Sequence, residues 1–285
     1  MRQGGAERAP ADMAGQMATR LAGLHEAARL LDREGEPVDS PLRLALAERL
    51  QDMFAALLEQ EPVASTLEIG AFEAGMSRRA LALRPDLAAY ALEANPHVYA
   101  RFARDAIRAR VRYIHAAAAG SIGTARLRIP RAIDGRGLPP VNPIGSLCPR
   151  AQGEVRYEEV TVSTIPLNAL RRMYAIPAPH ALWIDVEGAQ MQVIRGGGRV
   201  LADTAILFIE LESFGYWREG ARADEVTEAL AQAGLFPVAR DFEAPGQFNV
   251  IFARHEVIER RAELLDTGLG HIEALLAARP ARAAR

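Results

Sequence analysis

Short apolar runs alternate with amphipathic stretches from about residue 65 to residue 253. The runs predict strands near residues 66–69, 88–92, 111–115, 181–185, 205–211, 235–240 and 247–253. Strands that alternate with helices pair in parallel, with the helices as crossover connections. We therefore expect an α/β fold built on a parallel sheet with crossover helices.

Two helical stretches precede the first strand, at residues 16–34 and 40–60. In the second, Ser40 suits the N-cap and Pro41 the first helical position. Its apolar side chains recur every three or four residues, at Leu42, Leu46, Leu50, Met53 and Leu57. This face could belong to a lid, to a homodimer contact through the N-terminal helices, or to the core, and packing in the core is its commonest use.

The chain divides by composition and pattern into four parts. Residues 1–15 and the tail ARPARAAR lack a sustained pattern, so we expect disorder at both ends. Residues 16–62 form a helical extension, residues 63–256 the α/β domain, and residues 257–285 a C-terminal helix and tail. Within the domain, residues 120–166 interrupt the alternation and predict an inserted strand pair around a long Gly/Pro-rich loop.

A glycine turn follows the first predicted strand. Residues 65–75 read STLEIGAFEAG, so the strand ends near Glu68 and the turn carries Gly70 and Gly75. Another acid, Glu93, closes the second strand. A lone glycine pair usually marks only a tight turn. In open α/β sheets, however, ligands bind beyond the carboxyl ends of the strands, where an acid accepts hydrogen bonds from ribose. The pattern therefore favours a nucleoside-containing cofactor.

Residues that are missing from this turn narrow the choice of cofactor. Met76 stands where a P-loop needs lysine, and Phe72 replaces the second glycine of the dinucleotide fingerprint. Glu68 and Glu73 disfavour a polyphosphate and suit a ligand that carries an ammonium and a sulfonium. S-adenosylmethionine fits these features best. For Glu73 and for Ser77, capping of the next helix is the simpler interpretation.

Composition indicates a soluble enzyme. Hydrophobic residues make up 49% of the 285 positions, while a net charge of -2 and 6% aromatics indicate no nucleic-acid surface. All 34 basic side chains are arginine, which excludes lysine chemistry. The single cysteine, Cys148, excludes an internal disulfide and a multi-cysteine metal site, and the histidines show no metal-ligand spacing. With no signal-like or membrane-length apolar run, we expect a cytoplasmic protein with no membrane partner.

The stretch LWIDVEGAQMQVIRGG, residues 182–197, follows EIGAFEAG and LEANP and precedes IELE and FNVIFAR. In this order the motifs resemble the FkbM family of S-adenosylmethionine-dependent methyltransferases, over about residues 65–253. The resemblance implies a class I methyltransferase fold, a Rossmann-like doubly wound sheet of seven strands with the last antiparallel. It further implies a site for the cofactor. The methionine end of the cofactor would contact Glu68, Gly70, Ala71 and Gly75, with Phe72 in the same turn. The ribose and adenine would contact Glu93, Ala94 and Asn95, and the base would lie near His115, Ala116 and Ala117.

Acids near two later strand ends are candidate catalytic residues. Asp185 and Glu187 lie two apart and face the same side of an extended chain, and Glu210 follows on the next strand. They could accept a proton from a hydroxyl acceptor, with Asp185 also touching the cofactor. The same carboxylates could hold Mg²⁺, although nothing else in the sequence supports a metal. Alternatively, Asp185 and Glu187 cap the following helix.

The resemblance implies O-methylation of a hydroxyl on a sugar, glycan precursor or secondary metabolite, so the partner is a small-molecule or glycan acceptor. Loops longer than about 12 to 15 residues are often functional, and we expect residues 134–150 to cover the acceptor pocket. Trp183 stands where the family commonly has lysine, and Asn168 where it commonly has aspartate. The alternative is a catalytically inactive S-adenosylmethionine-binding module in a biosynthetic complex. A nucleotide-sugar or NAD enzyme is disfavoured by the turn.

Overall fold

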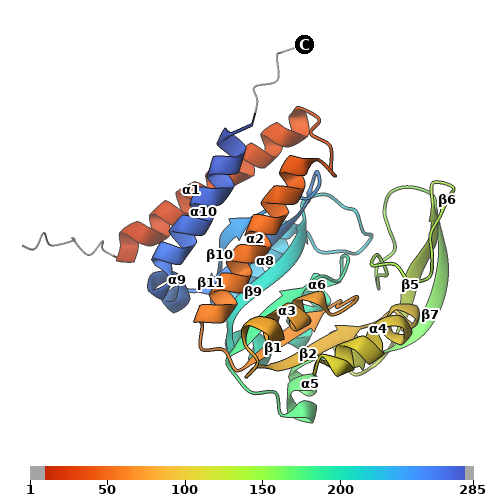
Figure 1. The fold of residues 1–285 in the computed structure, drawn as a ribbon. Coiled ribbons are helices and arrows are strands. Elements are labelled where there is room, and N and C mark those ends of the chain that lie inside the picture. Colours follow the sequence, from red (N-terminus) through yellow and green to blue (C-terminus); the bar gives the residue numbers. More distant parts are fainter. Residues whose placement is uncertain (1–9, 280–285) are drawn as a thin grey trace, which may run out of the picture.

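The computed structural model describes residues 10–279 and is organised around a central sheet (Figure 1). In this part of the chain the sheet has seven strands in the order β10-β11-β9-β8-β1-β2-β3. Their bounds are Ser65–Ile69 (β1), Ala88–Glu93 (β2), Arg112–His115 (β3), His180–Ile184 (β8), Thr204–Glu212 (β9), Leu235–Arg240 (β10) and Gln247–Arg254 (β11). β11 runs antiparallel to both neighbours, whereas the other pairs are parallel. The fold prediction is confirmed, and the predicted strand ends agree to within one residue.

Helices cover both faces of this sheet because its strands are apolar on both sides. Along β9, Phe208 faces one core cluster with Phe54, and Leu207 and Ile209 face the other. Such continuous apolar runs are typical of parallel strands buried on two faces. The crossover helices are α3 (Gly75–Leu83), α4 (Pro96–Arg108), α5 (Leu167–Tyr174), α6 (Gln190–Gly196), α7 (Gly198–Ala202) and α8 (Ala223–Gln232).

The helices from both ends of the chain gather on one side of the sheet (Figure 1). They are α1 (Pro10–Arg33), α2 (Pro41–Gln60), α9 (His255–Arg260) and α10 (Ala262–Ala277). The Ser40 hydroxyl accepts a hydrogen bond from Arg43 N at 3.2 Å, and Pro41 opens α2, as predicted. Four of the five apolar side chains of the predicted α2 face are buried and Leu42 packs against them, so this face lies in the core of the chain.

The helices near both ends of the described chain differ from those that the sequence predicts. α1 begins at Pro10, inside the stretch expected to be disordered, because a packed helix extends outward at little cost through helix-forming residues such as Ala and Met. Residues 1–9 and 280–285, which complete the two expected tails, lie outside the described residues. The C-terminal segment forms α9 and α10 where one helix was expected.

The interruption between residues 120 and 166 is a long strand pair. β5 (Gly123–Ile133) pairs antiparallel with β7 (Val155–Ile165), and β4 (Ala117–Ala118) and β6 (Arg136–Gly137) extend them to a four-stranded sheet within residues 10–279. This hairpin projects away from the terminal helices (Figure 1). Between β6 and β7 the chain returns toward the central sheet. No helix in the described part of the chain is long and apolar enough to cross a membrane.

Candidate functional site

A cavity lies where β1, β2, β3 and β8 end. Six of the candidate residues from the sequence line it, namely Gly70, Glu93, Ala94, Ala116, Ala117 and Asp185. The other wall includes Pro143, Gly145 and Leu147 from the segment between β6 and β7. The cavity measures about 50 Å³, whereas small-molecule pockets commonly measure about 300 to 1,000 Å³. The segment that forms this wall therefore closes most of the space at the strand ends.

Gly70 permits the close approach that shapes the cavity. Its φ is +78°, and a Cβ atom built there would lie 1.6 Å from the carbonyl oxygen of Asp185. Asp185 N in turn donates to Ile69 O at 2.9 Å. Only glycine combines this backbone conformation with the absence of a side chain. The turn after β1 consequently lies directly against the end of β8 and brings Asp185 to the cavity.

Glu93 organises the turn as well as lining the cavity. One carboxylate oxygen accepts from Phe72 N at 2.8 Å and the other from Asn95 N at 2.7 Å. Phe72 has a φ of +43°, and the Tyr113 hydroxyl donates to its carbonyl oxygen. Burial raises the pKa of the Glu93 carboxyl to about 7, while the two backbone N–H groups act in the opposite direction. Each oxygen has a second acceptor position, so the carboxylate can also accept from a ligand hydroxyl.

Glu68 caps the helix after the turn. It is 4% exposed and accepts from the backbone N–H groups of Met76 at 3.1 Å and Ser77 at 2.7 Å. Glu73, for which capping was the simpler interpretation, is exposed and lies 3.4 Å from Arg78. The sequence favoured Glu73 as the cap, whereas Glu68 caps α3. This was missed because the carboxylate that reaches the N-terminus of α3 comes from the preceding strand. Glu68 does not line the cavity, which leaves its predicted cofactor contact a prediction.

The remaining cofactor candidates do not line the cavity. They are Ala71, Phe72, Gly75, Asn95 and His115. Asn95 caps α4 by accepting from His97 N at 3.0 Å. The His115 imidazole is exposed, stacks on Tyr99 with the ring centroids 4.9 Å apart, and has Nε2 3.2 Å from Ala94 O. His180 begins β8 and is buried at the opposite edge of the sheet.

Asp185, Glu187 and Glu210 come together beside the cavity. One carboxylate oxygen from each lies within 4.8 Å of the others. Burial raises the pKa of Asp185 to about 7, and it raises the pKa values of Glu187 and Glu210 well above their ordinary range, with repulsion from Asp185 adding to both. Ala189 is the N-cap of α6 and no side chain caps this helix. The capping interpretation of Asp185 and Glu187 therefore lacks a contact.

Three further acids surround this cluster, and sequence reasoning missed two of them, Asp241 and Glu243. Glu212 ends β9, and Asp241 and Glu243 lie in the loop between β10 and β11. Asn249 Nδ2 donates to Asp241 at 2.8 Å and to Glu243 at 2.7 Å. Glu243 contributes to the raised pKa of Asp185 by repulsion. A run such as RDFEAPGQ carries no catalytic motif, and it reaches the same edge as Asp185 because β10 runs in the same direction as β8 and β9 and ends there.

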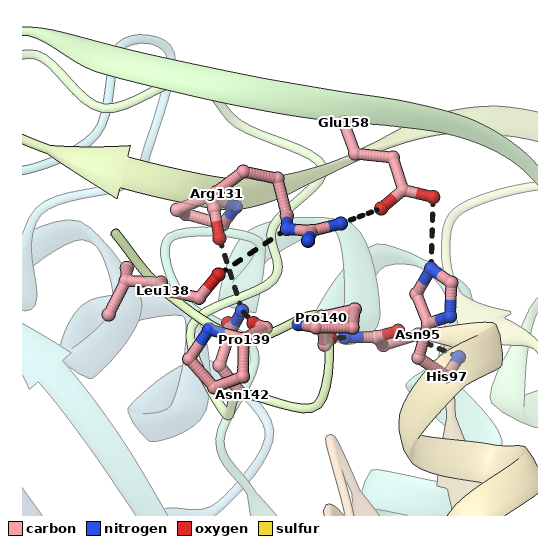
Figure 2. Close-up of polar contacts among 9 residues, drawn as sticks. Asn95, His97, Arg131, Leu138, Pro139, Pro140, Asn142 and Glu158 are labelled. Atoms are coloured by element: carbon pink, nitrogen blue, oxygen red, sulfur yellow. Dashed lines mark hydrogen bonds and ion pairs between the residues drawn. The ribbon is translucent and has the colours of Figure 1, made fainter. Parts of the chain in front are cut away.

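The segment 138–149 is held to the hairpin and α4 by polar contacts (Figure 2). Asn95 Nδ2 donates to Pro140 O at 3.1 Å, and Asn142 Nδ2 donates to Pro130 O at 3.1 Å and Pro139 O at 2.7 Å. Nearby, the Glu158 carboxylate lies 2.9 Å from both His97 Nε2 and Arg131 Nη1. These contacts join the base of the segment to the helix that follows β2.

The far end of the segment contacts the turn that carries the acids. Ser146 exchanges backbone hydrogen bonds with Arg128 at 2.8 and 3.0 Å, and its hydroxyl donates to Glu187 O. The Cys148 sulfur lies 3.7 Å from Gly188 O. The segment therefore spans from the cofactor side of the cavity to the acid cluster. Its expected role over an acceptor pocket stays a prediction.

Trp183 and Asn168, two positions that depart from the family pattern, lie away from the cavity. Trp183 stacks on Phe208 with ring centroids 3.6 Å apart and meets Phe54 edge-on at 5.8 Å, so it fills the core beneath α2. Asn168 Oδ1 accepts from Arg199 N at 3.0 Å and Val200 N at 3.2 Å at the start of α7. Both side chains therefore support packing and helix geometry.

Solved structures similar to this chain include two proteins described as methyltransferases and one domain with SAH bound, all of low sequence identity. An O-methyltransferase family protein from Burkholderia thailandensis is 10% identical, with 86% of this chain and 71% of that chain covered and a TM-score of 0.39. A putative tRNA (m1A22) methyltransferase from Streptococcus pneumoniae is 12% identical, with 80% and 98% covered and a TM-score of 0.40. The N-terminal domain of EvdMO1 with SAH bound is 11% identical, with 76% and 81% covered and a TM-score of 0.40.

No curated protein matches the chain significantly. The family comparison does: residues 71–235, more than half of the chain, match the methyltransferase FkbM domain. This range begins in the glycine turn and includes Glu93, Asp185 and Glu210. The chain belongs to the FkbM methyltransferase family.

Proposed function

We propose that this protein is an O-methyltransferase that transfers the methyl group of S-adenosylmethionine to a hydroxyl of a small molecule or glycan. One observation carries the proposal. The Glu93 carboxylate at the end of β2 and the Asp185 carboxylate at the end of β8 line the same cavity, where the glycine turn begins. The Glu93 carboxylate can accept hydrogen bonds from the ribose hydroxyls. The Asp185 carboxylate next to it can accept the proton of an acceptor hydroxyl.

The residues of the cavity fit the cofactor in chemistry. Glu93 would accept hydrogen bonds from the ribose hydroxyls, and the small side chains of Ala116 and Ala117 leave room for a flat base. The acids at this edge offset the positive charge of a sulfonium. When bound, the cofactor supplies an activated methyl group. Its size requires the wall formed by Pro143, Gly145 and Leu147 to move, since the cavity of about 50 Å³ is too small.

Asp185 has the properties of a general base. No hydrogen bond or ion pair within residues 10–279 engages its carboxylate, and burial raises its pKa to about 7. A base with a pKa near the working pH combines availability with proton affinity. We assign it the proton of the acceptor hydroxyl, whose oxygen would bond to the methyl carbon as the bond between that carbon and sulfur breaks, which leaves S-adenosylhomocysteine. Orientation of that oxygen contributes the larger part of the rate, up to about 7 to 11 kcal/mol in well-arranged cases.

The test is product analysis with the purified full chain, S-adenosylmethionine and a panel of sugars, glycans, phenols and amines. The proposal requires S-adenosylhomocysteine to accumulate together with a mass increase of one methyl group on an oxygen. Methylation of nitrogen would replace the acceptor class. Cofactor binding without transfer to any acceptor would favour the inactive binding module.

Glu93→Ala should weaken S-adenosylhomocysteine binding about 10- to 150-fold, because hydrogen bonds to a charged group contribute about 1.5 to 3 kcal/mol. Titration calorimetry measures the loss. The variant also frees Phe72 N and Asn95 N, so circular dichroism must show that it is folded. Glu73→Ala removes an exposed acid of the same turn and serves as the matched control. Equal affinities in all three proteins would exclude Glu93 as a cofactor ligand.

Cofactor binding should also open the contact between Ser146 and Arg128. Loss of one hydrogen bond costs about 0.5 to 1.5 kcal/mol, so the Ser146 amide should exchange its hydrogen roughly 2- to 13-fold faster with S-adenosylhomocysteine bound. Hydrogen exchange followed by NMR or mass spectrometry measures this, with the Leu67 amide in β1 as the internal reference. Unchanged protection at Ser146 in the saturated complex would show that the cofactor enters without moving this wall.

A further inference from the structure

We propose that Asp185, Glu187 and Glu210 bind one divalent cation, of the Mg²⁺ or Mn²⁺ type, at the edge of the cavity. The presence of the cation stands on the geometry of these three residues alone. Its role toward an acceptor hydroxyl rests on the proposed function.

The three carboxylates converge as ligands of one ion would. They come from the end of β8, the turn before α6 and the end of β9, and one oxygen from each lies within 4.8 Å of the others. Oxygens that share a Mg²⁺ ion at about 2.0 to 2.1 Å are at most about 4.0 to 4.2 Å apart. Small side-chain rotations would bring the three oxygens, all within 4.8 Å of one another, to this spacing. Glu187 holds a φ of +51°, a conformation uncommon for a non-glycine residue, in the turn that carries its side chain.

Glu210 supplies a second, independent observation. It is 4% exposed, and its Oε2 atom is buried with no hydrogen-bond partner. The side chain is fixed in place, since Oε1 accepts from Gln247 Nε2 at 2.7 Å. Gln190 Nε2 also donates to the backbone oxygen of Glu210 at 3.1 Å. A buried acceptor without a partner is costly, and a cation bound to the Glu210 carboxylate would remove that cost.

The charged residues around the cluster also favour a bound cation. Within residues 10–279 no arginine or histidine forms an ion pair with Asp185, Glu187 or Glu210, although ion pairs are frequent elsewhere in that range. The nearby Arg150 guanidinium attracts the charge of Glu187 without forming an ion pair with it, and it lies over the Trp217 ring, 5.4 Å from its centroid. Carboxylate oxygens without cationic side chains are the ligand set that Mg²⁺ and Mn²⁺ favour.

The position gives such an ion a use. Asp185 and Glu187 are partly exposed, so ligand positions on the cavity side remain open to water or an acceptor. A hydroxyl oxygen bound to the cation loses its proton more readily. That proton passes to the carboxylate oxygen of Asp185 that does not bind the metal, and the hydroxyl oxygen is left as the nucleophile.

Titration of Mn²⁺ alone into the full chain tests the site, with free Mn²⁺ followed by electron paramagnetic resonance. We expect one site per chain in the wild type. Glu210→Gln should weaken it at least about tenfold, since even outer-shell partners change metal affinity about 10- to 100-fold. Glu73→Gln makes the same change at an exposed acid and should bind like the wild type. If Glu210→Gln fails to fold, Glu187→Gln takes its place.

Absence of a Mn²⁺ site in the wild type, or equal affinity in wild type and the folded cluster variant, overturns the proposal. If the wild type binds no Mn²⁺ and methylates an amine acceptor, we would infer that the three acids bind the ammonium group of that acceptor. The readout needs no methyl transfer. Metal binding without any methylated product would therefore contradict only the proposed function.

Discussion

Asp185→Asn is expected to lower the turnover number by about 10² to 10⁴, the usual contribution of a positioned general base, while S-adenosylhomocysteine still binds. The amide keeps the size of the side chain and its place at the end of β8, but it cannot accept the hydroxyl proton. A carboxylate that also holds a cation would add to the loss. Steady-state kinetics with an acceptor from the panel, at saturating concentrations of both substrates, measures the effect.

Asp86→Asn is the matched control for this variant. Asp86 pairs with Arg84 on the surface at 2.7 Å and lies outside the cavity, so its turnover should equal that of the wild type. If Asp185→Asn retained full turnover, Asp185 would be neither the base nor a metal ligand needed for the reaction.

Gly70→Ala is expected to lower the free energy of unfolding by about 2 to 5 kcal/mol and to abolish cofactor binding. A Cβ atom would lie 1.6 Å from Asp185 O at a φ of +78°, which combines backbone strain of about 1 to 3 kcal/mol with overpacking of similar size. Relief requires β1 and β8 to separate at the cavity. Urea denaturation and titration with S-adenosylhomocysteine measure the two effects.

Gly120→Ala provides the comparison, because nothing lies within 4 Å of a Cβ atom at that glycine. It should change stability by less than about 0.5 kcal/mol, as exposed substitutions usually do. A Gly70→Ala protein with wild-type stability and cofactor affinity would contradict the tight contact between the glycine turn and Asp185.

The sheet could be predicted from the chain because most of its strands are short apolar runs bounded by turn residues. Glu93 and Gly70 were recognisable for the same reason, since parallel strands present their carboxyl ends at one edge. The role of Glu68 could not be recognised from the sequence. Its partners are two backbone N–H groups of α3, which come close only after the turn at Phe72 and Ala74 has formed.

Contacts between distant parts of the chain explain the other differences. Arg43 is 1% exposed inside the α2 face, where it pairs with Asp32 at 2.8 Å and donates to Phe242 O at 2.6 Å. Periodicity alone marks such a position as polar and outward-facing. Glu243 likewise reaches the acid cluster only because the loop after β10 folds over it. The path of residues 138–149 depends on hydrogen bonds to Pro130, Arg128 and Glu187 that no local pattern encodes.

Titration calorimetry of S-adenosylmethionine and S-adenosylhomocysteine into the wild-type protein tests the central claim most directly. The geometry of Gly70, Glu93 and Asp185 predicts one site per chain for both compounds, with S-adenosylmethionine displaced by S-adenosylhomocysteine. No binding of either compound by protein that circular dichroism shows to be folded would contradict the cofactor site at the ends of β1 and β2, and with it the proposed methyl transfer.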